Sequence, residues 1–424
     1  SDAALKAFLT NRVGDMGLLV GVTVLFFAAG SALPGRFGSF SIAETNALAS
    51  SGMLSHTALV VASCGLMAAV MSKSGQFFLH TWLPDAMAGP TPVSALIHAA
   101  TMVVAGVFMI ARMYGVFFEG FQIGGSAINL MAFIGGLTTI VGACLAFVQR
   151  DIKKVLAYST ISQLGYMFLA VGCGAYVAAV FHMVTHAFFK ALLFLGSGSV
   201  NHATGTFDMR YMGGLRRVQP WTYATFLLAA LSLAGIFPLA GFWSKDEILL
   251  GAWNGTGLVG TWVSRVTFSA LLAGVIVTAF YTIRMIILTV HGEFRGGIDR
   301  ELEEKAQTVP AGASHGGVHL AESPWVMVLP MLALGVGAVA IGYLANPQWT
   351  EEIGIPRHWI SGFLGDGLNA ALGAAGHAET LDFSRWMATI STVAALSGIG
   401  LAVAVYLRRR DQREDPLSKV KPVH

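Results

Sequence analysis

Ten stretches of mostly apolar residues, each about as long as a bilayer is thick, divide this chain of 424 residues. A hydrocarbon core of ~30 Å is crossed by a helix of about 20 residues. Because backbone groups in lipid need internal hydrogen-bond partners, such stretches must be helical. The sequence therefore predicts an all-α, polytopic membrane bundle of about ten spans. They cover roughly residues 8–30, 57–82, 91–113, 125–148, 153–172, 174–200, 221–253, 264–290, 325–345 and 385–407.

The composition agrees with this fold and excludes other classes. Hydrophobic residues make up 55% of the chain and charged residues 12%, whereas soluble domains carry about 25% charged residues. The net charge is +3 and no basic run alternates with aromatics, so we expect no nucleic-acid partner. The three cysteines stand singly, without a CxxC pair, so no metal or redox centre is predicted. The chain also lacks nucleotide-binding and nucleophile-elbow motifs, so we expect it to hold no cofactor.

Two polar segments interrupt the apolar pattern. Residues 292–323 are predicted to form an extramembrane loop, and residues 346–384 to lie at the membrane interface. Lysine and arginine gather in alternate loops, which places one side of the bundle, and both ends of the chain, in the cytoplasm, or in the matrix or stroma of an organelle. The residues on that side are Lys6, Arg12, Arg150, Lys153, Lys154, Arg210, Arg216, Arg217, Arg295 and 408–410.

The strongest functional signal is a row of ionisable residues in the sixth span. An ionisable residue inside a span costs at least ~2.5–3.5 kcal/mol, which marks it as a functional candidate. His182, His186 and Lys190 are spaced four residues apart, so they share one helix face over about 12 Å. A metal site is the alternative, because two histidines four residues apart can chelate. The adjacent lysine and the lack of a neighbouring carboxylate or thiol disfavour a bound cation, and histidine is suited to proton transfer near neutral pH.

A second group of candidates lies in the first three spans. Lys73 stands among small residues near the end of the second span. It lies too deep to reach the lipid surface, although a snorkelling lysine is the alternative. His98 follows two prolines that suit a helix start, and by itself would more often be a structural core histidine. Arg12 and Asp15 are three residues apart in the first span and are predicted to form an ion pair.

The third group, Lys245 and Asp246, follows a proline and a glycine within residues 238–241. We interpret the seventh span as two half-helices around this break. Broken helices at membrane depth line wet cavities and often mark ion sites. The alternative is an ordinary helix start, with Ser244 as the N-cap and Glu247 completing a capping box. The two interpretations are compatible if the half-helix begins inside the membrane.

Together, these groups favour proton transfer through the membrane. Nearby charge decides how tightly a buried lysine holds its proton, so moving an anion can make the lysine release or bind one. Lysines, histidines and water in a row can then pass protons in steps. Nothing in the sequence converts energy, so the driving force must come from another subunit or an ion gradient.

These motifs resemble the antiporter-like subunits of respiratory complex I, and the distal, L-type subunit most closely. The resemblance covers about residues 3–290, and its motifs occur in the order of the family. They are residues 6–15, 82–102, 151–160, 185–192 and 241–247.

The resemblance implies two inverted five-helix repeats, each with a broken helix, here the second and seventh spans, which fits Pro84 and Pro238. The first repeat is incomplete. Residues 1–118 would be its last three helices, 119–291 the second repeat, 292–323 the extramembrane loop, and 324–424 further helices and a cytoplasmic tail. The glutamate that pairs with the lysine at position 73 in the family, and the family's lateral helix, lie outside this sequence. We therefore expect the chain to be the core of a longer subunit.

The resemblance also implies roles for the candidate residues. Lys73, Lys190 and Lys245 would carry protons, His98, His182 and His186 would link them through water, and Arg12 and Asp15 would tune Lys73. The complex would be a translocase that pumps protons as electrons pass from NADH to quinone in other subunits. FMN, iron–sulfur clusters and quinone are expected in those subunits, with a neighbouring antiporter-like subunit as the principal membrane partner. The expected location is a bacterial inner membrane or a mitochondrial inner membrane.

Other functions remain open on the sequence. A subunit of a multi-subunit sodium/proton antiporter or of a membrane-bound hydrogenase would share these motifs. A scaffold that docks partners would not need the charges of Lys190 and Lys245. An inorganic-carbon uptake subunit would be paired with a zinc protein.

Overall fold

The computed structural model describes residues 1–33, 35–123, 129–254, 262–306, 318–344, 359, 362–364 and 383–407. Within these ranges the regular elements are helices, apart from one antiparallel bridge between Asp151 and Asp208. Eight of the described helices are long and apolar enough to cross a membrane. They are α1 (Asp2–Ala32), α3 (His56–Lys73), α8 (Leu130–Val148), α9 (Ile152–Gly172), α10 (Tyr176–Thr204), α13 (Trp262–Val290), α15 (Trp325–Ala340) and α17 (Arg385–Ala402).

Two further spans are each divided into two helices, which brings the described part of the chain to the ten predicted spans. The seventh span consists of α11 (Pro220–Ala234) and α12 (Ala240–Asn254), so the predicted break is confirmed. The third span was predicted to be continuous, but it divides into α5 (Thr91–Ala99) and α6 (Ala105–Arg112). There the Val103 carbonyl accepts a hydrogen bond from the Ser74 hydroxyl at 2.7 Å. That side-chain bond replaces a bond of the helical ladder, as is required inside a membrane.

The second span is also broken, as the resemblance implied, but at Lys73 rather than at Pro84. Helix α3 ends at Lys73, and the chain becomes helical again in α4 (Trp82–Asp85) and η1 (Ala86–Ala88), with Pro84 inside α4. Gly75 follows the end of α3 with a left-handed φ of +55°, which glycine adopts without strain. The break therefore places Lys73 at a helix end, beside α1 at the edge of the bundle.

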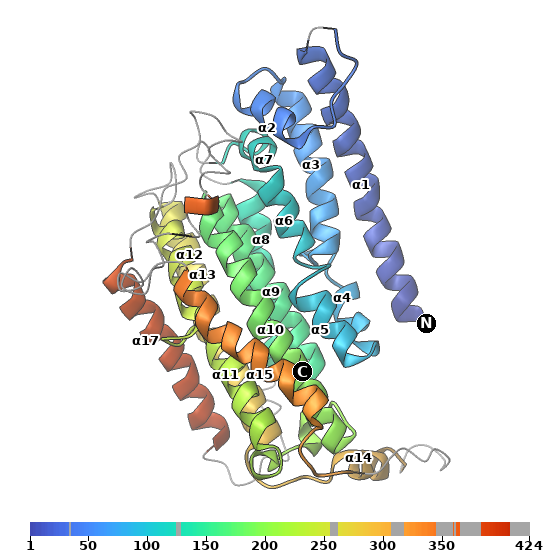
Figure 1. Ribbon diagram of the computed structural model, residues 1–424, viewed down its shortest axis with the longest axis vertical. Coiled ribbons are helices and arrows are strands. Elements are labelled where there is room, and N and C mark those ends of the chain that lie inside the picture. The colour runs from blue at the N-terminus through green and yellow to red at the C-terminus, as the bar shows by residue number, and fades with distance from the viewer. Residues whose placement is uncertain are drawn as a thin grey trace.

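Helices α9 and α10 form the centre of the bundle. Figure 1 shows α1 and α3 at one edge and α17 at the opposite edge, with α8 to α10 between them. In α9, 94% of the most apolar window is buried inside the protein, against 28% in α1 and α17. Glycines on α8 and α9 let these two backbones meet directly, as small residues do in membrane helix pairs. Polar side chains on α9 and α10 are therefore shielded from lipid.

Tryptophan pairs mark the two ends of the bundle. Trp221 and Trp325 lie 6.0 Å apart between ring centroids, and Trp253 and Trp386 lie 5.3 Å apart at the other end of the interrupted seventh span. Such aromatic belts sit at membrane interfaces. The N-terminus and the short α14 (Gly297–Ala306) lie at the first of these ends (Figure 1). We call it the basic end, because Lys6, Arg150, Lys154, Arg210 and Arg295 gather there.

Buried Arg295 ties the loops of the basic end together. Its guanidinium donates hydrogen bonds of 2.8 Å to the carbonyls of Met209 and Arg210. Burial lowers the pKa of Arg295 to about 10, so the side chain keeps its charge at neutral pH. The helical turns η2 (Met209–Tyr211) and η3 (Leu215–Arg217) lie in this region. The opposite end carries α2 (Ile42–Ser50) and α7 (Tyr114–Gly120) (Figure 1).

Some predictions fall on parts of the chain outside the described residues. These include most of the predicted interface segment 346–384, residues 408–410 and the cytoplasmic tail. The last described elements are η4 (Ile341–Leu344) after α15 and the π-helical turn η7 (Val403–Leu407) after α17.

Candidate functional site

The predicted row on α10 lies in the interior of the bundle. His182, His186 and Lys190 are each 0% exposed. The two imidazole rings are 6.3 Å apart between centroids, and Phe189 packs against both. Because the three side chains belong to one long unbroken helix, their order along the bundle axis is rigid. They form the central row of the candidate site.

Lys190 is held by neutral groups. Its amine donates a hydrogen bond to the Ser159 hydroxyl of α9 at 2.6 Å and a longer one to the Leu156 carbonyl at 3.4 Å. The Ser159 hydroxyl is in turn 2.6 Å from the hydroxyl of Tyr281 on α13. Among the described residues, no carboxylate forms an ion pair with Lys190. No neighbouring anion among these residues therefore stabilises the protonated form of Lys190.

His182 has a partner on each ring nitrogen. Its Nδ1 is 2.8 Å from the Ser244 hydroxyl of α12, and its Nε2 is 3.2 Å from the Gln163 amide oxygen of α9. The Thr185 hydroxyl bonds the same Ser244 at 2.9 Å. A hydroxyl both donates and accepts, so it can support the imidazole as donor or as acceptor. His182 thus connects three helices through groups that tolerate a moving proton.

His98 and His186 present unpaired ring nitrogens in the same interior. His98 is 0% exposed, and its ring lies 5.2 Å from that of Phe194 on α10. Within the described residues, neither ring nitrogen of His98 or His186 meets a hydrogen-bond partner. His186 lies beside the backbone of Ala99, the last residue of α5, and so faces the helix that carries His98. Buried polar atoms of this kind are suited to bind water.

Lys245 binds the end of a half-helix. Its amine donates a hydrogen bond of 2.5 Å to the carbonyl of Leu233, in the last turn of α11. Gly235 ends that helix with a φ of +82°. The carbonyls at a helix C-terminus are unpaired and carry partial negative charge, which favours a cation. The predicted association of Lys245 with a broken helix is therefore present in the structure.

The interpretation of Ser244 as a helix N-cap is wrong. Helix α12 begins at Ala240, so Ser244 lies one turn inside it and bonds His182 instead. The reason is that the chain returns to a helix immediately after Leu239. The backbone N–H of Gly241 is satisfied by the Ser232 hydroxyl at 3.2 Å, so this helix start needs no cap from Ser244.

Lys245 and Asp246 are neighbours in sequence but do not pair. Lys245 points to α11, whereas one carboxylate oxygen of Asp246 accepts a short hydrogen bond from Ser391 of α17. The other oxygen of Asp246 has no partner among the described residues, and the residue is 6% exposed. Consecutive residues on a helix are 100° apart, which explains the divergence.

Lys73 belongs to a separate group at the edge of the bundle. Its amine forms a 3.0 Å ion pair with Asp15 of α1, and Asp15 is 3.6 Å from Arg12, which confirms the predicted pair in α1. The Lys73 side chain is 33% exposed on the described surface. The structure does not bring this group into contact with the central row.

Sequence reasoning missed two buried cations. Lys153 was counted as a loop charge, yet it is 2% exposed, and Arg284 of α13 is 1% exposed. Arg284 donates hydrogen bonds to the Gln149 carbonyl at 2.9 Å and to the Tyr406 hydroxyl at 3.1 Å. A charge inside an apolar stretch was the signal available for Arg284. The partners of both residues depend on tertiary contacts.

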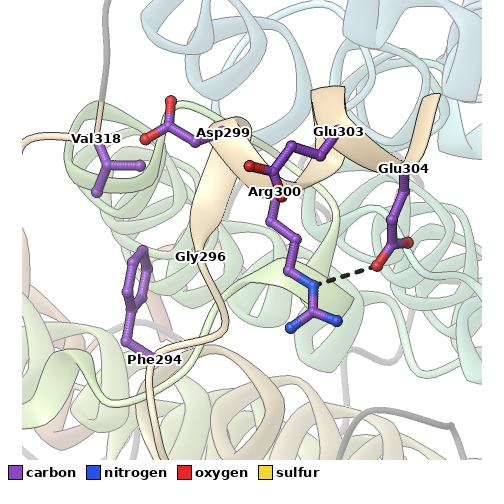
Figure 2. A pocket seen from close by; sticks show the side chains of 7 residues that line it. All are labelled: Phe294, Gly296, Asp299, Arg300, Glu303, Glu304 and Val318. Carbon is purple, nitrogen blue, oxygen red and sulfur yellow. Dashed lines mark hydrogen bonds and ion pairs between the residues drawn. The ribbon is translucent and has the colours of Figure 1, made fainter. Parts of the chain in front are cut away.

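A large open hollow at the basic end contains none of the predicted residues. Figure 2 shows that charged side chains of α14 surround it, with an ion pair of 3.2 Å between Arg300 and Glu304. Its volume is about 750 Å³, and Phe294 and Val318 lie on its apolar side. This polar surface agrees with the prediction that the segment around α14 is extramembrane.

Comparison with known protein families gives a match over most of the chain. Residues 1–273 match the family described as "NADH:quinone oxidoreductase/Mrp antiporter, TM". The matched residues include all nine predicted site residues, from Arg12 to Asp246.

The curated relatives are named as chains of NAD(P)H-quinone oxidoreductases. The chain is 46% identical over 422 residues to "NAD(P)H-quinone oxidoreductase chain 5" of Picosynechococcus sp., covering 97% of this chain and 60% of that protein. It is also 46% identical to the protein of that name from Synechocystis sp., covering 83% of this chain and 54% of the relative. The chain thus spans little more than half the length of these relatives.

A solved structure shares the fold. The "Structure of Mrp complex from Dietzia sp. DQ12-45-1b" contains a chain that matches with a TM-score of 0.72 and 26% identity. The match covers 100% of this chain and 42% of that one. The antiporter-like, multi-span membrane fold expected from the sequence is therefore confirmed.

Proposed function

Because the chain belongs to the NADH:quinone oxidoreductase/Mrp antiporter membrane family, we propose that it is a proton-translocating, membrane-arm subunit of an NAD(P)H:quinone oxidoreductase. The observation that carries the proposal is the central row of His182, His186 and Lys190, buried on one helix without a fixed counter-charge among the described residues. Burying three ionisable groups inside the membrane costs free energy, so their presence indicates a functional role. The names of the relatives favour the quinone reductase over other members of the family.

The site supports a stepwise proton path. Lys190 exchanges protons with His186 and His182 through short steps along α10, and the Ser244 and Gln163 side chains hold His182 in either tautomer. Lys245 continues the path on α12 toward Asp246 and the end of the bundle opposite the basic end. Lys73, tuned by Asp15 and Arg12, forms a second station reached through His98. The chain does no redox chemistry itself.

The wider assembly follows from this role. We propose that the driving electron transfer, with its FMN, iron–sulfur clusters and quinone, takes place in partner subunits. The principal membrane partner is a neighbouring antiporter-like subunit. Residues 1–118 and 119–291 then correspond to an incomplete and a complete inverted repeat. The basic end faces the cytoplasm of a bacterial cell.

Substitution of Lys190 tests the proposed function. In the complete complex reconstituted in liposomes, Lys190→Ala should abolish the proton uptake that this subunit contributes, while assembly persists. The reason is that alanine removes the only titratable group at that step of α10. The control is Arg217→Ala, which removes an exposed positive charge from the basic end. Unchanged proton uptake per quinol in the Lys190 variant would reject the proposal.

A sodium/proton antiporter subunit is the second candidate, and the fold shared with the Mrp complex favours it. The two functions differ in their partners and in their driving force. Redox subunits that co-purify with the chain, and proton uptake that depends on NAD(P)H, indicate the quinone reductase. Sodium-dependent proton movement without electron transfer indicates the antiporter.

A further inference from the structure

The buried side chain of Lys153 has no role in the path described so far. It lies at the start of α9 and is 2% exposed. Its amine donates hydrogen bonds to the carbonyl of Met87 at 3.0 Å and to that of Gly89 at 2.8 Å, where the broken second span ends. The amine also lies 4.6 Å from the ring centre of Phe207. We call these two carbonyls and this ring the cage of Lys153. No described carboxylate forms an ion pair with the amine.

Two pockets at the basic end are lined in part by residues of this cage. A pocket of about 430 Å³ is lined by Met87, whose carbonyl binds the amine, and by Asp85 and Asp151. A second pocket of about 560 Å³ is lined by Phe207, whose ring covers the amine, and again by Asp151. Each pocket is thus lined by a residue that also contacts the Lys153 amine.

The inner side of the cage leads to the central row. Gly89 directly precedes the N-cap of α5, and His98 lies in the last turn of that nine-residue helix. The helix is about 13 Å long. His98 is close enough to interact electrostatically with both Lys153 and Lys190. It is thus a histidine near both the cage and the central row.

The cage accommodates both protonation states of the amine. A neutral amine has two N–H groups, and these match the two carbonyls of Met87 and Gly89. Its lone pair then stays free to accept a proton. The ammonium form has a third N–H, and its charge is favourable over the face of Phe207. Neither state leaves a carbonyl of the cage unsatisfied.

We propose that Lys153 carries protons from the pockets of the basic end to His98, and through it to Lys190. The ammonium gives one proton to an inward acceptor, and the resulting amine takes one from hydronium in a pocket, which leaves water, so charge and atoms balance without any electron transfer. The proposal rests on the proposed function, because it supplies the uptake step of that path. In the alternative, Lys153 only fixes the end of the broken span.

Three variants of the complete, reconstituted complex separate these roles. Lys153→Arg keeps a permanent charge and donors for both carbonyls, but it cannot release a proton. Lys153→Gln removes the charge, and Lys153→His restores a group that titrates. The control is Arg217→Gln, at an exposed position of the same end. Lys190→Ala defines the proton uptake that belongs to this chain.

If Lys153 carries protons, Lys153→Arg and Lys153→Gln should each slow that part of the uptake at least ~10-fold, as expected for loss of a positioned acid–base group. Wild-type uptake in Lys153→Arg would overturn the proposal in favour of a positioning role. If Lys153→Arg does not assemble, Lys153→His decides: uptake above that of Lys153→Gln supports proton transfer, and equal uptake overturns it. Unchanged uptake in Lys190→Ala would instead reject the proposed function.

Discussion

The contact between α8 and α9 allows a test with two adjacent glycines. A Cβ atom added at Gly135 would lie 2.4 Å from the backbone nitrogen of Leu169 and 2.8 Å from the carbonyl oxygen of Gly165. At Gly136, the nearest atoms would be the terminal carbons of Leu169 at 3.9 Å, an ordinary contact. The same substitution by alanine therefore forces two backbones apart at one position and fills available space at the next.

The expected energies follow from two terms. Replacing glycine by alanine inside a helix gains up to about 1 kcal/mol of helix propensity. This gain is common to both positions and cancels in the comparison. Overpacking costs ~1–3 kcal/mol where the neighbour cannot move away, and backbone atoms of α9 are such neighbours. Gly135→Ala should therefore be less stable than Gly136→Ala by about 1–3 kcal/mol.

Thermal unfolding of the purified complex in detergent measures this difference, with the assembled fraction as a second readout. Gly135→Ala should have the lower Tm. It should also weaken proton uptake, because α9 carries Ser159 and Gln163, the partners of Lys190 and His182. Equal Tm values for the two variants, or a lower value for Gly136→Ala, would refute the close backbone contact.

Two further predictions concern single hydrogen-bond partners. Ser244→Ala removes the Nδ1 partner of His182 and should slow proton uptake without loss of assembly. The control Ser232→Ala, in α11, should mainly lower Tm, because it leaves the N–H of Gly241 without its partner. Equal rates of proton uptake in Ser244→Ala and wild type would remove Ser244 from the path. Glu322 accepts hydrogen bonds from Trp221 N–H at 2.8 Å and Thr222 Oγ1 at 2.7 Å in the first turn of α11. Glu322→Gln should cost ~0.3–1 kcal/mol through the helix dipole, measured as a Tm decrease that high salt reduces; a salt-independent change would argue against an electrostatic origin.

Much of this protein is determined by its sequence alone, because hydropathy and helix geometry are local properties. Apolar length predicts the spans, since lipid leaves the backbone no alternative to a helix. The spacing of His182, His186 and Lys190 places them on one face, because they belong to a single regular helix. Proline and glycine within 238–241 predict the break beside Lys245 for the same local reason.

The partners of these residues were decided by the tertiary structure. Ser244 bonds a histidine 62 positions away, and Lys153 bonds carbonyls 64 and 66 positions away. No local pattern encodes such pairs, because they depend on how helices dock. The sequence therefore predicts which groups can carry protons. The docking of α9, α10 and α12 decides which neighbours hold those groups, and places Lys153 beside residues that line the pockets of the basic end.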